Sequence, residues 1–345
     1  MTTSWIQYLQ QTGAQIDNNI ALHFGHPDQE QQQALSGDII ADLSYLGLIQ
    51  ISGSEAEKFL QGQLTNDVRQ VTTEQSQLSA WCSPKGRILV NFRLFQRDNA
   101  YYLLLPQDSL EATLKRLQMY VLRADVKLEA ASDRLPCVGI AGANSTQILT
   151  NCLGKAPPTE VNASVTIDQS TIICLPGRQP RYLILSETLP DFWQCATQSA
   201  LPTGAAAWQL LEILAGLPQV VPATADEFVP QMVNYQALGG INFKKGCYTG
   251  QEVVARMQYL GSLKRRMYLV QIDTPTPPQP GDSLYVKTSE QSVGKIVNAS
   301  LHPEGGTIAL AVIQINHAEN DEIHLHNPQG NRLQLLSLPY SLPAT

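Results

Sequence analysis

The chain has 345 residues, of which 43% are hydrophobic, and a formal net charge of −7 with a pI near 5.4. This length is enough for two or three modest domains, each with its own core. The negative charge argues against a broad basic face that coats nucleic acid, because such binding depends on many phosphate contacts.

Cysteine usage and hydropathy predict a cytoplasmic protein without disulfides. The six cysteines form no C-x-x-C pair, which fits neither a zinc ribbon, nor a redox dithiol motif, nor a small disulfide scaffold. The stretch M-T-T-S-W-I-Q-Y-L-Q lacks the basic and apolar regions of a signal peptide, and no later stretch approaches the roughly 20 apolar residues that span a bilayer. We therefore expect a reducing cytosol, no membrane partner and no metal site.

Two pairs of similar segments indicate an internal repeat. I-S-G-S-E-A-E-K-F-L, from Ile51, resembles I-A-G-A-N-S-T-Q-I-L, from Ile140. Y-L-L-L-P-Q-D-S-L-E-A-T-L, from Tyr102, is echoed by Y-L-I-L-S-E-T-L-P-D-F-W-Q, from Tyr182. Each segment combines a short apolar strand with a helical pattern, and the pairs follow in the same order. The sequence thus predicts an α+β fold built on a duplicated unit.

Local start signals predict the helices of the first repeat. Ser54 precedes Glu57 by three residues and Asp108 precedes Glu111 by three, so both Ser54 and Asp108 fit side-chain caps. In the helix after Asp108, apolar residues recur at one-face spacing: Leu110, Leu114, Leu117 and Val121.

A further helix is expected over residues 205–216. A-A-A-W-Q-L-L-E-I-L-A-G is rich in helix formers and ends at Gly216, with Pro218 just beyond. On composition alone, Trp208 would fill the core.

From Leu263 onward the chain is strand-like, and proline-rich T-P-T-P-P-Q-P-G begins at Thr274. The short apolar segments separated by turn residues predict a small β-barrel or sandwich.

Cys247 lies in K-K-G-C-Y-T-G-Q-E, residues 244–252. With Thr249 as the expected N-cap of a helix reaching Tyr259, the thiol would precede the helix by two residues. The helix dipole and the charges of Lys244 and Lys245 would then favour a thiolate. Such a group could be a nucleophile, a metal or cluster ligand, or a redox group, and the alternative is a buried cysteine packed as a small hydrophobe.

The run Q-A-L-G-G-I-N-F-K-K-G-C-Y-T-G-Q-E-V-V-A-R, from Gln236, resembles the signature of the YgfZ family, which is related to the T-protein of the glycine cleavage system. Agreement extends to F-L-Q-G-Q-L-T-N-D-V at Phe59, K-G-R-I-L-V-N-F-R-L-F at Lys85, F-V-P-Q at Phe228 and L-P-Y-S-L at Leu338. The resemblance covers nearly the whole chain.

This resemblance implies a folate-binding module of two similar α+β subdomains over residues 1–260, followed by a closed six-stranded β-barrel over residues 261–345. It also implies a tetrahydrofolate ligand. The function it implies is that of an accessory protein for the assembly or maintenance of iron–sulfur enzymes, including those that thiolate tRNA.

The resemblance also suggests site residues. Cys247 matches the signature cysteine, and Trp208 falls where the family has a tryptophan at its folate site, so we expect the indole to stack on a pterin ring. Leu46, with Tyr45 beside it, replaces a second family tryptophan. Cations for a polyglutamate tail would come from the basic group Lys244, Lys245, Arg256, Lys264, Arg265 and Arg266.

An aminomethyltransferase like the T-protein is the alternative. The T-protein carries adjacent aspartates where this chain has Val90 and Asn91, so the positioning carboxylate is missing. A folate-gated docking module remains open as a third reading. Direct tRNA binding is disfavoured by the acidity of the chain.

Overall fold

The computed structural model describes residues 4–259 and 261–342. Its contacts divide the chain into two compact units, each built from several segments. The first unit holds residues 1–59, 69–77 and 93–211, and the second holds 60–68, 78–92 and 212–345. In this division residues 212–259 group with the C-terminal sheet, and the expected domain boundary at residue 260 stays a prediction.

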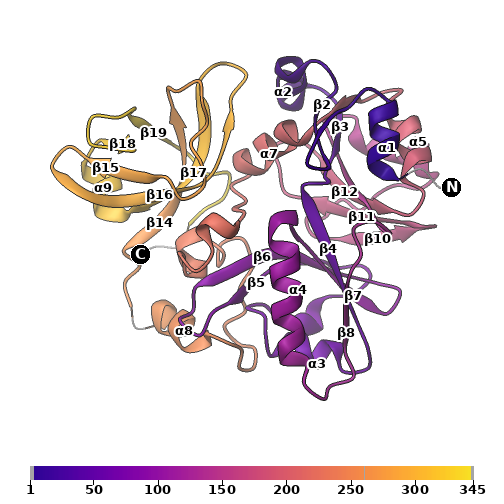
Figure 1. The fold of residues 1–345 in the computed structure, drawn as a ribbon, viewed down its shortest axis with the longest axis horizontal. Helices are drawn as coiled ribbons and strands as arrows, with labels where there is room; N and C mark the ends of the chain where they lie inside the picture. The colour runs from indigo at the N-terminus through magenta and orange to yellow at the C-terminus, as the bar shows by residue number, and fades with distance from the viewer. Residues whose placement is uncertain (1–3, 260, 343–345) are drawn as a thin grey trace. The chain divides into compact units, whose positions relative to one another are not determined.

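The helices and strands up to residue 203 build two large sheets and a small hairpin (Figure 1). In chain order they are α1 (Trp5–Gln11), β1 (Gln15–Asp17), β2 (Ile20–His23), α2 (Pro27–Ser36), β3 (Ile39–Asp42), β4 (Leu46–Ser52), α3 (Ala56–Gln61), the 3-10 turn η1 (Val68–Gln70), β5 (Gln77–Cys82), β6 (Ile88–Arg97), β7 (Ala100–Pro106), α4 (Gln107–Val121), β8 (Lys127–Ala130), β9 (Cys137–Ala141), α5 (Ser145–Leu153), β10 (Ser164–Ile167), β11 (Ser170–Leu175), β12 (Arg181–Ser186), α6 (Leu189–Ala196) and β13 (Leu201–Thr203).

The predicted duplication is confirmed by the order of the strands. One sheet runs β5-β6-β7-β4-β8 and the other runs β10-β11-β12-β9-β3-β13. In each, a strand and a short helix are followed by an antiparallel meander and a longer connection through a helix, so that β4-α3-β5-β6-β7-α4 matches β9-α5-β10-β11-β12-α6. Strand β4 pairs antiparallel with β7 just as β9 pairs with β12. Apolar strand residues from both sheets fill the core of the first unit.

Both predicted helix caps in the first repeat are wrong. Helix α3 begins at Ala56, and the Ser54 hydroxyl donates instead to the Asp125 carboxylate at 2.7 Å. Helix α4 begins at Gln107 with Pro106 in the N-cap position, which places Asp108 inside the first turn. The helices themselves exist as expected, because the apolar spacing is a stronger signal than the cap. Leu110 and Leu117 are buried on the sheet side of α4.

The expectation of a chain without disulfides is also wrong. Cys152, at the end of α5, is bonded to Cys195, near the end of α6. Both helices belong to the second repeat, where they match α3 and α4 of the first, and they pack against each other. A separation of 43 residues with no short motif gives no local sign of such a bond.

The remaining elements belong to the second unit, apart from residues 205–211 of α7, which belong to the first. They are α7 (Ala205–Leu214), the 3-10 turns η2 (Pro222–Thr224) and η3 (Pro230–Val233), α8 (Gln251–Tyr259), β14 (Arg265–Ile272), β15 (Ser283–Val286), β16 (Ser289–Leu301), β17 (Thr307–Gln314), α9 (Ile315–Asn320), β18 (Ile323–Leu325) and β19 (Leu333–Leu336).

The C-terminal strands form an open, curled sheet, so the prediction of a closed barrel is wrong. Six strands were expected and six are present, in the order β18-β15-β16-β17-β14-β19. The short edge strands β18 and β19 share no ladder, and in the described part of the chain the single bridge between His324 and Arg332 joins these ends. Closure needs a continuous ladder around the sheet. The result is a half-barrel over an aliphatic core.

Within the described residues, no helix combines the length and the apolar character needed to cross a membrane.

Candidate functional site

The second unit gathers the sequence segments around Cys247. Residues 60–68, 85–92, 228–231, 236–256 and 338–342 all belong to it, although they are spread over most of the chain. Hydrogen bonds join them in sequence-distant pairs. The Ile88 amide donates to the Phe228 carbonyl at 2.8 Å, and the Gln231 side chain donates to the Val254 carbonyl at 2.7 Å.

Lys245 makes the strongest of these connections. Its side chain is 6% exposed, and its ammonium donates to the carbonyls of Gln61, Leu64 and Asn66 at 2.8, 2.6 and 3.0 Å. These carbonyls surround the end of α3, where backbone acceptors lack helical partners. The predicted role of Lys245 in holding a polyglutamate tail does not fit this geometry, because its three protons point at backbone oxygens.

The loop that carries Lys245 is also held by two buried polar side chains, Thr65 and Asn66, which follow α3. Asn66 donates to the Gly239 carbonyl at 2.7 Å and to the Leu78 carbonyl at 2.9 Å. Thr65 donates to the Gly240 carbonyl at 2.8 Å. The glycine pair therefore presents its backbone to the Q-L-T-N-D segment, and residues 236–245 are fixed along their length.

Tyr248 is the second buried residue beside Cys247. It is 8% exposed, and burial raises the pKa of its hydroxyl, with a smaller effect from Cys82. The Lys245 ammonium lies 5.1 Å from the centre of the Tyr248 ring, which is within cation–π range. Residues 245 and 248 are thus both buried, while Gly246 and Cys247 between them are exposed.

Cys247 lies farther from the helix than predicted. Helix α8 begins at Gln251, so Gly250 takes the N-cap position expected for Thr249. Gly250 has a φ of +82°, and a Cβ there would come within 2.8 Å of the Gly86 Cα. A helix start pressed against another backbone at positive φ requires glycine. Cys247 therefore precedes the N-cap position by three residues instead of two, and its thiolate character stays a prediction.

Cys247 is the exposed one among the four free cysteines. Burial raises the pKa of the Cys82, Cys137 and Cys174 thiols, which keeps these groups protonated and inert. The thiol of Cys247 is free to meet a partner in solution. This arrangement contradicts the buried-cysteine reading and leaves nucleophilic, ligand and redox chemistry open.

Lys244 and Arg256 are the exposed cations nearest in sequence to Cys247. Lys244 is exposed. Arg256 pairs with Glu252 at 2.6 Å, one turn away on α8, and both side chains are largely exposed. A pair of this kind contributes little to stability and leaves Arg256 accessible.

The predicted aromatic site lies in the first unit. Tyr45, Leu46 and Trp208 join one hydrophobic cluster, so the structure does bring these three together. Trp208 is 1% exposed, with the guanidinium of Arg181 at 5.3 Å from its ring centre. A Cβ on Gly139 would clash with the indole, which shows how closely strand β9 approaches it.

Trp208 is buried among protein atoms in the first unit, so the expected stacking of its indole on a pterin stays a prediction. Trp208 lies in the hydrophobic core, as composition alone predicted, and its part in folate binding is untested. The sequence signal that was missed is Arg181, whose buried side chain covers the ring.

Asn91, which the resemblance aligns with the adjacent aspartates of the T-protein, is fully engaged. Its amide donates to the Pro218 carbonyl and the Tyr235 hydroxyl, both at 2.7 Å, and its oxygen accepts from the Val220 amide at 2.7 Å. A carboxylate could not make the two donations. Asn91 therefore holds β6 to the segment after α7 and is unsuited to proton transfer.

Sequence comparison with known proteins assigns the chain to a family. The chain is 33% identical over 308 residues to the tRNA-modifying protein YgfZ of Colwellia psychrerythraea, a match that covers 88% of this chain and 94% of that protein. The chain belongs to the YgfZ family. Members from Enterobacter sp. and Escherichia coli O45:K1, also described as tRNA-modifying, are 32% and 33% identical over 86% of this chain and 91% of theirs.

The fold of this YgfZ-family chain is aminomethyltransferase-like. Residues 8–169 match the model of the GCVT N-terminal domain. The crystal structure of the glycine cleavage system aminomethyltransferase T from Bartonella henselae superposes with a TM-score of 0.75, at 16% identity, over 96% of this chain and 95% of that one. At that identity the likeness extends to the fold alone.

Proposed function

We propose that this YgfZ-family chain is a folate-binding accessory factor for iron–sulfur enzymes that modify tRNA, and that it acts through the thiol of Cys247. The observation that carries the proposal is the placement of this thiol. Cys247 is exposed between buried Lys245 and Tyr248, on a loop that hydrogen bonds hold at several points. A thiol held in this way is accessible to a large partner without reorganisation of the loop.

The family assignment supports the tRNA-modifying pathway, since the similar proteins are described as tRNA-modifying. The partners in this proposal are iron–sulfur enzymes, including those that thiolate tRNA. Direct contact with tRNA is disfavoured, because a net charge of −7 works against binding that depends on many phosphate contacts.

Tetrahydrofolate enters the proposal as a ligand suggested by the aminomethyltransferase-like fold. No position for it follows from the described side chains, and no step at Cys247 is derived from it. Equilibrium dialysis of tetrahydrofolate against the full chain tests this part, with Trp208→Phe as the variant that keeps the core filled. Binding weaker than millimolar would remove folate from the proposal.

The geometry at Asn91 weighs against aminomethyl transfer. A neutral amide whose donors and acceptor are all used can neither take up a proton nor stabilise a developing charge. We therefore do not assign the transferase reaction to this chain. Turnover of an aminomethyl-lipoyl carrier with tetrahydrofolate would reverse that assignment.

Complementation tests the role of Cys247. A bacterial strain that lacks its own family member would carry the wild-type chain, Cys247→Ser, or Gly246→Ala as a control on the same loop, where an added Cβ meets nothing within 4 Å. We expect Cys247→Ser to reduce methylthiolated tRNA at least fivefold with an unchanged melting temperature, and Gly246→Ala to behave as wild type. Full modification with Cys247→Ser would overturn the proposal.

A further inference from the structure

Two loops of the second unit pack against helix α8. A Cβ on Gly86 would lie 2.7 Å from the Cβ of Val253, so the turn from β5 to β6 presses on the start of the helix (Figure 1). At the other end of α8, the rings of Phe243 and Tyr259 meet edge to face with their centres 6.1 Å apart. Residues 243–250 therefore begin beside the last turn of α8 and end at its first turn, and Cys247 lies between.

These segments are rich in cations. Residues 82–92 and 243–266 carry eight Lys or Arg side chains and one acidic side chain, that of Glu252, although the whole chain has a net charge of −7. Lys245 is buried, and Glu252 is paired with Arg256 at 2.6 Å. In the described part of these segments, the exposed cations are Lys85, Arg87, Lys244, Arg256 and Lys264.

Two further carboxylates adjoin the β5–β6 turn and already have partners. The Arg87 guanidinium donates to the backbone carbonyls of Asp226 and Glu227 at 3.1 and 3.4 Å. The Asp226 carboxylate accepts from the Ser83 hydroxyl at 2.6 Å, and Glu227 pairs with Lys295 at 3.0 Å. With these groups included, the cations still outnumber the carboxylates around α8.

Tyr259 adds an exposed aromatic ring to this surface. It is 66% exposed and follows exposed Arg256 by three positions, so the two side chains lie on one side of α8. Tyrosine and arginine are enriched among the residues that dominate the binding energy of protein interfaces. A partner that meets this surface therefore gains from an apolar side chain as well as from carboxylates.

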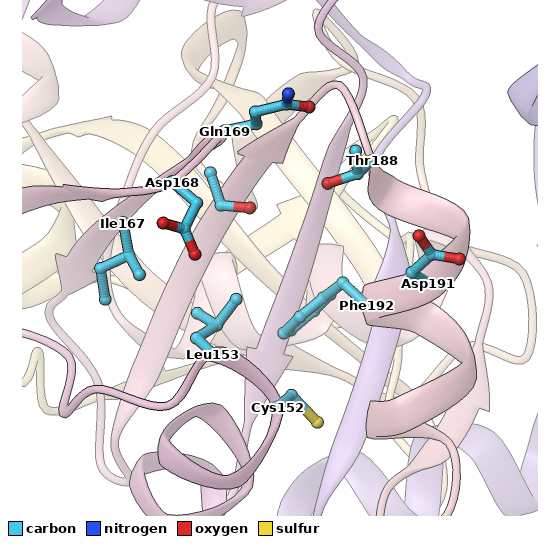
Figure 2. Close-up of a pocket in the computed structure, with 9 residues that line it drawn as sticks. Cys152, Leu153, Ile167, Asp168, Gln169, Thr188, Asp191 and Phe192 are labelled. Carbon is cyan, nitrogen blue, oxygen red and sulfur yellow. The ribbon is translucent and has the colours of Figure 1, made fainter.

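A cavity in the first unit has the opposite character. Its volume is about 340 Å3, and Asp168 and Asp191 line it from opposite sides (Figure 2). Arg97, whose guanidinium donates to the Gln169 carbonyl at 2.9 Å, is itself paired with two carboxylates. Carboxylates are thus in excess there, and an acidic ligand is directed to the surface around α8 instead.

We propose that the α8 surface, defined by Lys85, Lys244, Arg256 and Tyr259 on the segments that flank Cys247, docks an acidic segment of the partner enzyme. The carboxylates of that segment meet the cations, and an apolar side chain in it meets Tyr259. This inference rests on the function proposed above, since docking here brings the partner enzyme to the thiol.

An acidic protein segment suits this surface better than RNA does. Positive charge is concentrated around α8 in a chain of net charge −7. The phosphates of a tRNA continue beyond so small a surface and meet the negative charge of the remaining chain, whereas a short protein segment ends within it.

The first test measures binding to the full chain. The probe is a fluorescein-labelled peptide of six glutamates, one phenylalanine and one leucine, followed by fluorescence anisotropy at low salt. We expect the variant with Lys244→Glu and Arg256→Glu to bind it at least tenfold more weakly, and Tyr259→Ser about threefold more weakly. The matched control, Lys155→Glu with Arg178→Glu, removes the same charge from exposed positions of the first unit and should bind within twofold of wild type.

Three results of this test would overturn the proposal. One is equal weakening in the control variant, and another is peptide binding that does not change in the α8 variant. The third is a different ligand: unmodified tRNA, or tetrahydrofolate pentaglutamate, that binds wild type more tightly than the peptide does and is lost in the α8 variant.

The second test uses the complementation strain described for Cys247. We expect Lys244→Glu with Arg256→Glu to reduce methylthiolated tRNA at least fivefold, with a melting temperature within about 2 °C of wild type, and Lys155→Glu with Arg178→Glu to act as wild type. Loss of modification with Cys247→Ser alone would overturn the docking surface and keep the proposed function. Loss with the α8 variant alone would support the docking surface and overturn the role of the thiol.

Discussion

Lys245→Met is the perturbation that most directly tests how the signature loop is held. Methionine keeps the apolar part of the side chain but removes the ammonium that donates to the carbonyls of Gln61, Leu64 and Asn66. A buried polar group left without a partner costs about 1–3 kcal/mol, and charge-assisted hydrogen bonds lie at the upper end. Water reaches the partly buried Gln61 more easily than the other two. We therefore expect a loss of about 3–5 kcal/mol in the free energy of unfolding.

Lys244→Met is the matched control. Lys244 is the preceding residue, carries the same charge and is exposed, so its replacement should change the free energy of unfolding by less than about 0.5 kcal/mol. Urea unfolding of both variants measures the difference. Amide hydrogen exchange should also show faster exchange in residues 236–250 of Lys245→Met and little change in β14 and β17. A difference below about 1 kcal/mol between the two variants would refute the role assigned to Lys245.

Three further predictions concern single positions. Gly250→Ala should destabilise by more than about 2 kcal/mol, because φ is +82° and the new Cβ meets the backbone of the β5–β6 turn, whereas Gly246→Ala should be nearly neutral in the same urea titration. Asn91→Asp should lower the free energy of unfolding by about 2–4 kcal/mol at pH 7, since the two hydrogen bonds that the amide donates are lost. The variant should not gain aminomethyl transfer. Thermal unfolding at the wild-type temperature would contradict the expected loss. Burial, and to a smaller extent the charge and hydrogen bond of Glu57, raises the pKa of the Tyr101 hydroxyl to about 12. Because the unfolded chain loses this proton near pH 10, the free energy of unfolding should fall between pH 10 and 12. Tyr101→Phe should make that fall less steep, and an unchanged slope would show that other groups cause it.

The sequence by itself determined the repeat and its helices. The apolar periodicity of 107–121 and the composition of 205–216 are local properties, and the helices α4 and α7 follow them closely. The two pairs of similar segments predicted equivalent units, and the strand orders of the two sheets agree. Capping signals at Ser54, Asp108 and Thr249 failed: the Ser54 hydroxyl bonds to Asp125 in a neighbouring loop, α4 begins before Asp108, and α8 begins after Gly250.

The family could also be recognised from the sequence alone, since the run from Gln236 is long and specific. It identified Cys247, and the structure adds that this thiol is the exposed one. Nothing in the letters K-K-G-C distinguishes a lysine in solvent from a lysine that binds three carbonyls. That distinction depends on residues 61–66, which are about 180 positions away in the chain.

Only the tertiary structure decided the orientation of Trp208, the bond between Cys152 and Cys195, and the open edge of the C-terminal sheet. Each depends on which surfaces meet after the chain has folded: Arg181 and Gly139 enclose the indole, α5 and α6 bring two distant sulfurs together, and two short edge strands fail to form a ladder. Periodicity and propensity describe single elements, whereas contacts of this kind arise between elements, and for that reason they could not be read from the sequence.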